Sequence, residues 1–149
     1  MTAYGLSAAG FVKSAQDAIN NGTLKIVKFG FDAGVAENRP TGAHKSGVIL
    51  PEGALVVGGV VIVDTLFKSA SNDTGTIAIH VESADDIVAA AAVSVAPYSS
   101  TGKKEIVPKI NTPESTSILL TEDREITFTV AVAALTAGKL HGFLIYVAP

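Results

Sequence analysis

One apolar stretch, residues 50–67, constrains the fold of this chain more than any other part of the sequence. It opens with a turn in which Pro51 has no amide proton for a strand ladder, and Val and Ile dominate the residues that follow. Between residues 55 and 62, apolar side chains occupy both alternating faces, interrupted only by Gly58 and Gly59. The stretch predicts a β-strand that needs cover on both faces, one from the core and one from another subunit.

The balance of apolar and charged residues leaves two explanations open. The chain has 149 residues, enough for one domain, and 48% of them are apolar. Only 17% are charged, compared with roughly 25% in a typical soluble domain. Either a dense β core uses many alanines on neutral positions, or part of the apolar surface is buried in an assembly.

Charge, cysteine content and apolar run length exclude several classes of protein. The formal charge is −3 and the 11 Lys and Arg residues are scattered, so we expect no nucleic-acid partner. Without cysteine there is no disulfide, thiolate nucleophile or Cys-containing metal site. No apolar run reaches the roughly 18 residues of a membrane span and no secretion signal is evident, so we expect a soluble protein with no membrane partner.

The remaining pattern is that of short strands separated by loops. A short helix over residues 7–20, or an extended arm, is expected in an N-terminal segment 1–22, and residues 23–149 are expected to form a single β-sandwich domain. Long loops are expected over residues 33–47 and in the polar connection containing Pro97 and Pro113, with a bulge near Ile26. The expected strands cover residues 23–32, 50–67, 76–82, the end of 85–95, 118–120, 125–133 and 139–147. This predicts an all-β, antiparallel β-sandwich, with a jelly roll as the expected topology.

The sequence gives only weak evidence for catalytic residues. Asp73-Thr74-Gly75 matches the tripeptide of aspartic proteases, in which two carboxylates share a proton. In that fold the Asp follows an apolar strand, whereas here a polar run precedes it, so a hairpin turn is the better interpretation. A small hydrolase built on Asp73 stays a remote alternative.

Candidate cofactor and metal sites are equally weak. Residues 42–47 have the glycine spacing of a phosphate loop but lack the Lys and the Ser or Thr that would bind phosphate and magnesium. The three histidines, His44, His80 and His141, match no metal-motif spacing, although a sandwich could bring His80 near His141. Glu82, Asp85 and Asp86 form an acidic corner without a calcium-loop pattern. We therefore predict no catalytic, cofactor-binding or metal-binding residue and no enzyme activity.

Several phrases of the sequence resemble a known group of proteins. The stretches 49–56, 75–82, 86–93 and 135–140, together with Tyr146, are similar to small structural proteins of tailed bacteriophage virions. The resemblance implies a capsid decoration or cement protein that binds the major capsid protein on the outer surface of the virion, often as a homotrimer, after assembly in the host cytoplasm. The predicted interface residues on the doubly apolar strand are Val56, Val60 and Ile62.

Two other functions remain open. A tail, neck or fibre-base adaptor of the virion would use a similar sandwich. A carbohydrate-binding module is a further alternative, because jelly rolls also serve lectins. The composition counts against it, since the chain has no Trp and only three Tyr to stack on a sugar.

Overall fold

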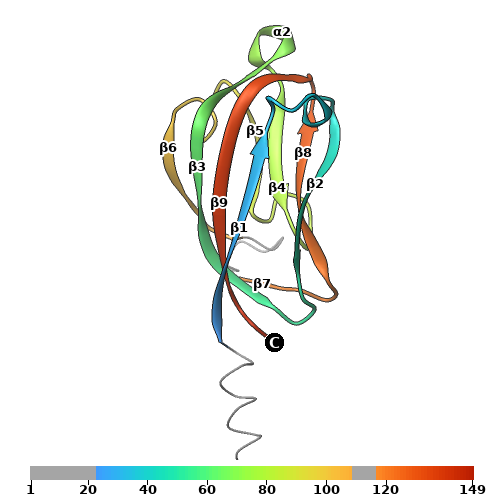
Figure 1. Ribbon diagram of the computed structural model, residues 1–149, viewed down its shortest axis with the longest axis vertical. Coiled ribbons are helices and arrows are strands. Elements are labelled where there is room, and N and C mark those ends of the chain that lie inside the picture. The colour runs from blue at the N-terminus through green and yellow to red at the C-terminus, as the bar shows by residue number, and fades with distance from the viewer. Residues whose placement is uncertain (1–22, 109–116) are drawn as a thin grey trace, which may run out of the picture.

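The computed structural model describes residues 23–108 and 117–149, and these form two antiparallel sheets packed face to face (Figure 1). The arm or helix expected over residues 1–22 lies outside the described residues. The elements in chain order are β1 (Leu24–Asp32), the 3₁₀ turn η2 (Ala36–Asn38), β2 (Gly42–Leu50), β3 (Leu55–Ser69), the single turn α2 (Ala70–Asp73), β4 (Thr76–His80), β5 (Val88–Ala92), β6 (Gly102–Ile106), β7 (Ile118–Leu119), β8 (Arg124–Ala131) and β9 (Leu135–Val147).

The strand order is that of a jelly roll. Sheet A has the order β1-β9-β3-β6, with β7 also paired to β3, and sheet B has the order β2-β8-β4-β5. Apart from the short β7, the pairs are nested: β1 pairs with β9, β2 with β8, β3 with β6 and β4 with β5. A long antiparallel ribbon folded over itself gives this nesting. The all-β sandwich expected from the sequence is confirmed.

Aromatic side chains fill the space between the sheets. Phe31 from sheet A stacks on Phe128 from sheet B with ring centroids 4.7 Å apart, and the rings of Phe67 and Tyr98 form a T-shaped pair. Tyr98 is fully buried, and its hydroxyl donates a hydrogen bond to the Ile77 carbonyl at 3.0 Å. Burial raises the pKa of this phenol, because the charged form would be desolvated.

Several sequence predictions of local structure were wrong. Two strands, β2 and β6, lie where long loops were expected. The bulge near Ile26 is absent, because β1 pairs with β9 in continuous register. The strand expected over residues 125–133 ends at Ala131, and the strand expected from residue 139 begins earlier, at Leu135. Residues 70–75 form a turn, as expected, but it carries the chain from sheet A to sheet B and joins no hairpin.

Within the described part of the chain, no helix has the length and apolar character needed to cross a membrane.

Candidate interaction surfaces

The outer face of sheet A is apolar over half its length. The even-numbered residues of β1 and the odd-numbered residues of β9 from Lys139 to Val147 point away from the core. The register brings them into rows with outward residues of β3, β6 and β7. We number four rows across the sheet. Row one is Leu24, Val147, Leu55 and Leu119; row two is Ile26, Ile145 and Gly58; row three is Lys28, Phe143, Val60 and Glu105; row four is Gly30, His141, Ile62 and Lys103.

Exposure confirms that these apolar side chains lack cover within the described residues. Leu24 is 62% exposed, Ile26 67% and Leu119 57%. Five further members of rows one to three, Leu55, Val60, Phe143, Ile145 and Val147, are partly exposed. Contiguous apolar patches of this kind mark interaction sites on soluble proteins.

The three predicted interface residues do not share a face. Val60 and Ile62 lie on the outer face of sheet A, in rows three and four, and their role in an interface stays a prediction. Val56 is fully buried in the core. A register irregularity between Val56 and Gly58 shifts the alternation of β3 by one residue, so the simple even-numbered pattern fails there.

Sequence reasoning missed the contribution of β1 and β9 to this surface. It assigned Leu24 and Ile26 to one face of the strand and the later apolar residues to the other, and expected a bulge near Ile26 where the two groups meet. Unbroken alternation instead turns Leu24 and Ile26 outward and Phe29 and Phe31 inward. The sequence contains this alternation, because the outward apolar residues of β1 are even-numbered and the inward ones are odd-numbered.

A hollow lies in the middle of the apolar surface. It has a volume of about 470 Å³, and its lining includes Ile26, Phe143 and Ile145 on one side and Val60 and Glu105 on the other. Gly59 also lines the hollow, and the β3 residue of row two is its neighbour Gly58, where a built Cβ would meet nothing within 4 Å. The missing side chain leaves room for an atom group from outside the molecule.

The outer face of sheet B is polar by comparison. Lys45, Thr127 and Thr129 lie on it, and the Nε2 atom of His80 is 3.0 Å from the Thr129 hydroxyl. The two outer faces of the sandwich therefore differ in chemistry, although Ile49 of β2 is also exposed, at 62%.

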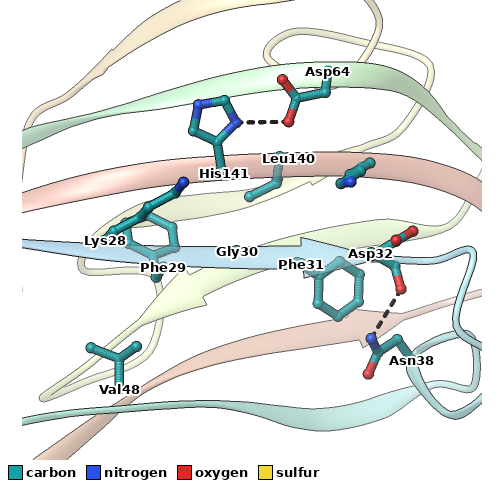
Figure 2. A pocket seen from close by; sticks show the side chains of 11 residues that line it. Lys28, Phe29, Gly30, Phe31, Asp32, Asn38, Val48, Asp64, Leu140 and His141 are labelled. Atoms are coloured by element: carbon teal, nitrogen blue, oxygen red, sulfur yellow. Dashed lines mark hydrogen bonds and ion pairs between the residues drawn. The ribbon is translucent and has the colours of Figure 1, made fainter.

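A groove of about 750 Å³ with a mixed polar and apolar lining runs along β1 at the open side of the sandwich (Figure 2). In it, His141 Nδ1 lies 2.7 Å from Asp64 Oδ2, a contact that sequence spacing did not reveal because 77 residues separate the two. Asp32 accepts a hydrogen bond from the Asn38 amide through its backbone carbonyl at 2.9 Å. The described residues that line the groove give it charged walls but no second histidine.

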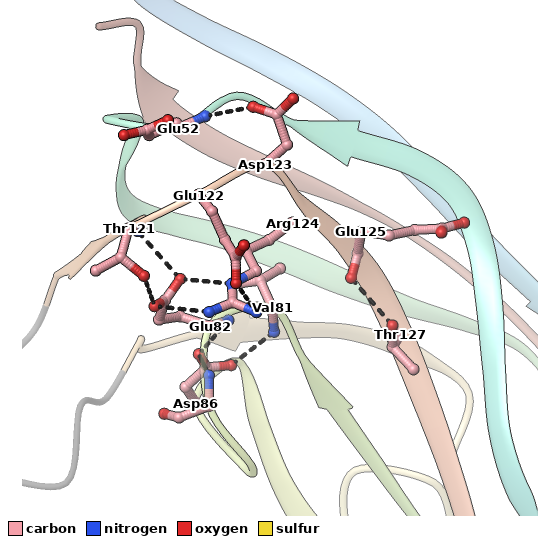
Figure 3. A network of polar contacts seen from close by, with 11 residues as sticks. Glu52, Val81, Glu82, Asp86, Thr121, Glu122, Asp123, Arg124, Glu125 and Thr127 are labelled. Atoms are coloured by element: carbon pink, nitrogen blue, oxygen red, sulfur yellow. Dashed lines mark hydrogen bonds and ion pairs between the residues drawn. The ribbon is translucent and has the colours of Figure 1, made fainter.

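The acidic corner expected near Glu82 is a structural network (Figure 3). Glu82 accepts hydrogen bonds from Arg124 at 2.9 and 3.2 Å and from the Thr121 hydroxyl, and Arg124 also pairs with Glu122 at 2.8 Å. The Arg124 hydrogen bonds hold the pKa of Glu82 below its usual range. This network ties the end of β4 to the start of β8.

Asp86 organises the neighbouring loop. It is almost fully buried, and its carboxylate accepts hydrogen bonds from the backbone N–H groups of Val81, Glu82 and Ser83 at 2.8–2.9 Å. Burial raises the pKa of Asp86, and the three hydrogen bonds oppose that shift. Asp85 instead accepts a hydrogen bond from the Ala90 N–H, so the three acids do not converge.

The other candidate residues also make local structural contacts. Asp73 accepts a hydrogen bond from the Ser69 N–H at 2.8 Å and pairs with Lys68 at 2.9 Å. Both contacts lower the pKa of Asp73, and the hydrogen bond from Ser69 has the larger effect. His44 donates to the Pro40 carbonyl at 2.7 Å. His80 lies on sheet B and His141 on sheet A, so the sandwich does not bring them together. Within residues 23–108 and 117–149, no group of three or more metal-ligating side chains occurs.

Comparison with known proteins gives a match of fold but none of sequence. No protein-family model matches the chain, and no curated protein matches it. Three solved chains do match. One belongs to the acid-stable capsid structure of Helicobacter pylori bacteriophage KHP30, with 15% identity and a TM-score of 0.58 over 87% of this chain and 90% of that chain.

The other two similar chains also come from phage capsids. One is in the capsid asymmetric unit of cyanophage Pam1, with 20% identity and a TM-score of 0.54 over 87% of both chains. The second is in the capsid of Ralstonia phage GP4, with 18% identity and a TM-score of 0.55 over 87% of this chain and 86% of that chain. The protein shares its fold with chains of three phage capsids.

Proposed function

We propose that this protein is a non-enzymatic structural component of a tailed-phage virion, and specifically a capsid decoration or cement protein. The observation that carries the proposal is the apolar outer face of sheet A, on a fold shared with chains of three phage capsids. Such a face on a jelly roll fits a protein that works by binding other subunits.

The rest of the described structure fits a role without chemistry. The carboxylates that resembled catalytic or metal-binding groups tie turns and strand ends together: Asp73 holds the α2 turn, Glu82 holds Arg124, and Asp86 holds the loop after β4. A cement protein needs this rigidity, because it bridges neighbouring capsid subunits by contact alone. The proposed partner is the major capsid protein, and the proposed site is the outer surface of the head.

The decisive measurement is the position and copy number of the chain in an imaged virion. A decoration protein should lie on the outer surface of the head in numbers comparable with the major capsid protein. A small number of copies at the neck, tail or fibre base would replace decoration with the adaptor function.

A binding experiment tests the same proposal without the virion. The purified protein should bind expanded capsids that lack it and raise their temperature of disruption. Failure to bind or stabilise such capsids would overturn the decoration role. A glycan array gives the contrasting outcome, since reproducible sugar binding would favour the carbohydrate-binding alternative.

A further inference from the structure

We propose that the outer face of sheet A binds the same face of a second copy of this chain, around a two-fold axis that runs parallel to the strands between β9 and β3. The biological meaning of this pair rests on the proposed function, but the pair itself is a property of the isolated protein. A contact of one face with itself closes with two copies, so the proposed pair differs from the three-fold assembly expected from the sequence.

The geometry follows from the strand order. Rotation about this axis reverses the order of the strands, so β9 of one copy lies over β3 of the other, and β1 lies over β6 and β7. Positions in the same row then face each other across the interface. In row one, Leu24 faces Leu119 and Val147 faces Leu55, and in row three, Phe143 faces Val60. Every one of these contacts joins two apolar side chains.

The charged residues at the two ends of row three are complementary under the same rotation. Lys28 on β1 faces Glu105 on β6 of the second copy, and the symmetry repeats this pair. Neither residue forms an ion pair within the described part of the chain. Three strand spacings, about 14 Å, separate them in one molecule, so they cannot pair internally. The strands of two packed sheets cross at about 30°. This rotation displaces Lys28 and Glu105 relative to each other by only about 4 Å, which a lysine side chain can span.

The shapes of the two faces are complementary as well. In row two, Ile145 of each copy lies over Gly58 of the other, where no side chain fills the space. Ile26 of one copy lies beside the part of the hollow that Val60 and Glu105 line in the other copy.

The other in-plane two-fold axis does not give this match. An axis perpendicular to the strands and through row two would place row one over row three, so that Leu24 faces Lys28 and Leu119 faces Glu105. Two charges would then be buried against leucines at each end. Charge complementarity therefore selects the axis parallel to the strands.

The size of the face suits a reversible pair. Four strands at about 4.8 Å spacing and nine residues at about 3.4 Å rise give roughly 550 Å² in projection. Stable complexes bury about 800 Å² of accessible surface per partner, and a corrugated surface exceeds its projection. The expected complex is a concentration-dependent dimer.

Charge reversal with mixing tests the proposal by analytical ultracentrifugation of the full chain at low salt. Lys28→Glu and Glu105→Lys each put like charges together twice per dimer, and each should weaken association about tenfold or more. An equimolar mixture of the two variants should restore it, because one variant then presents acidic side chains at both positions and the other presents basic ones. The double variant should also dimerise alone. Restoration by mixing can arise only between molecules.

A steric variant tests the row-two contact. Gly58→Phe should abolish dimerisation while leaving the fold unchanged, because its Cβ enters open space. Ala43→Phe is the matched control, since Ala43 is exposed on the outer face of sheet B, and it should dimerise normally. Circular dichroism and the melting temperature establish that both variants are folded.

Three outcomes would overturn the pair. The first is a wild-type chain that stays monomeric at all concentrations, and the second is a trimer that Gly58→Phe does not disturb. The third is a wild-type chain that is monomeric and binds capsids, with a Gly58→Phe variant that no longer binds them. That result would assign the outer face of sheet A to the capsid protein. Failure of capsid binding with an intact dimer would overturn the proposed function and leave the pair standing.

Discussion

At Val132 the backbone takes a φ of 70°, a conformation that a β-branched residue rarely adopts. The N–H of Ala133 donates to the carbonyl of Ala131 at 2.8 Å, so Val132 is the centre of a γ-turn between β8 and β9. Its side chain is 74% exposed and gains little from packing.

Replacing this valine should stabilise the protein. We expect Val132→Gly to raise the free energy of unfolding by about 1 kcal/mol, because relief of roughly 1–3 kcal/mol of strain exceeds the added flexibility of the unfolded chain. Chemical denaturation measures the change. Thr136→Gly, at an exposed position in β9, is the control and should lower stability; a loss in Val132→Gly as well would mean that the turn is unstrained.

The Glu82–Arg124 pair predicts a pH-dependent stability. Because the folded state lowers the pKa of Glu82, its stabilising effect is present above the pKa of a free glutamate and is lost as the pH falls through the folded value. Glu82→Gln should lower the melting temperature by roughly 2–5 °C near pH 7 and by almost nothing at about pH 2.

A matched control uses the same arginine. The side chain of Glu122 is 64% exposed, whereas that of Glu82 is 18% exposed, and both contact Arg124. Glu122→Gln should therefore change the melting temperature little at either pH. Equal effects of the two substitutions near neutral pH would contradict the role given to Glu82.

Among the elements, β3 contains two adjacent glycines whose surroundings differ completely. A Cβ on Gly59 would lie 2.2 Å from the Phe143 carbonyl oxygen of β9. Gly58 faces open space. One glycine is required for close strand packing and the other is not.

This difference gives a paired prediction for β3. Gly59→Ala should cost about 2–4 kcal/mol of stability, because β3 and β9 must separate at the centre of sheet A. Gly58→Ala should be neutral or stabilising by up to about 0.5 kcal/mol. Urea unfolding of the two variants compares them directly, and equal losses would show that the register of β3 on β9 is wrong.

The strands that sequence patterns found have apolar inward residues, whether they are central, such as β4, β8 and β9, or at an edge, such as β1. The missed strands, β2 and β6, lie at sheet edges and are rich in polar residues, including Lys45, Ser46, Lys103 and Lys104. Edge strands need less apolar cover, and lysines there discourage aggregation, so their composition resembles that of a loop. The rows on sheet A could not be predicted, because they depend on which residues of neighbouring strands lie opposite each other. A single sequence does not specify that register.

At the scale of the whole molecule, the two faces of β3 separate folding from association. Val61 is 1% exposed and Val60 is partly exposed in row three. Val61→Asp should prevent folding, because a buried carboxylate without a partner costs several kcal/mol. Val60→Asp should fold and lose self-association, as measured by circular dichroism and ultracentrifugation. A folded Val61→Asp dimer would contradict the assignment of the two faces.

The last strand of the chain is also the centre of sheet A, with β1 on one side and β3 on the other. During synthesis, at about 5–20 residues per second, roughly 5–20 seconds pass between the emergence of β1 and that of β9. Throughout this interval β1 and β3 have no shared partner, and their apolar side chains stay uncovered. The nascent chain therefore depends on β9 to cover these two strands, and synthesis that stops before residue 135 would give an aggregation-prone fragment instead of a smaller domain.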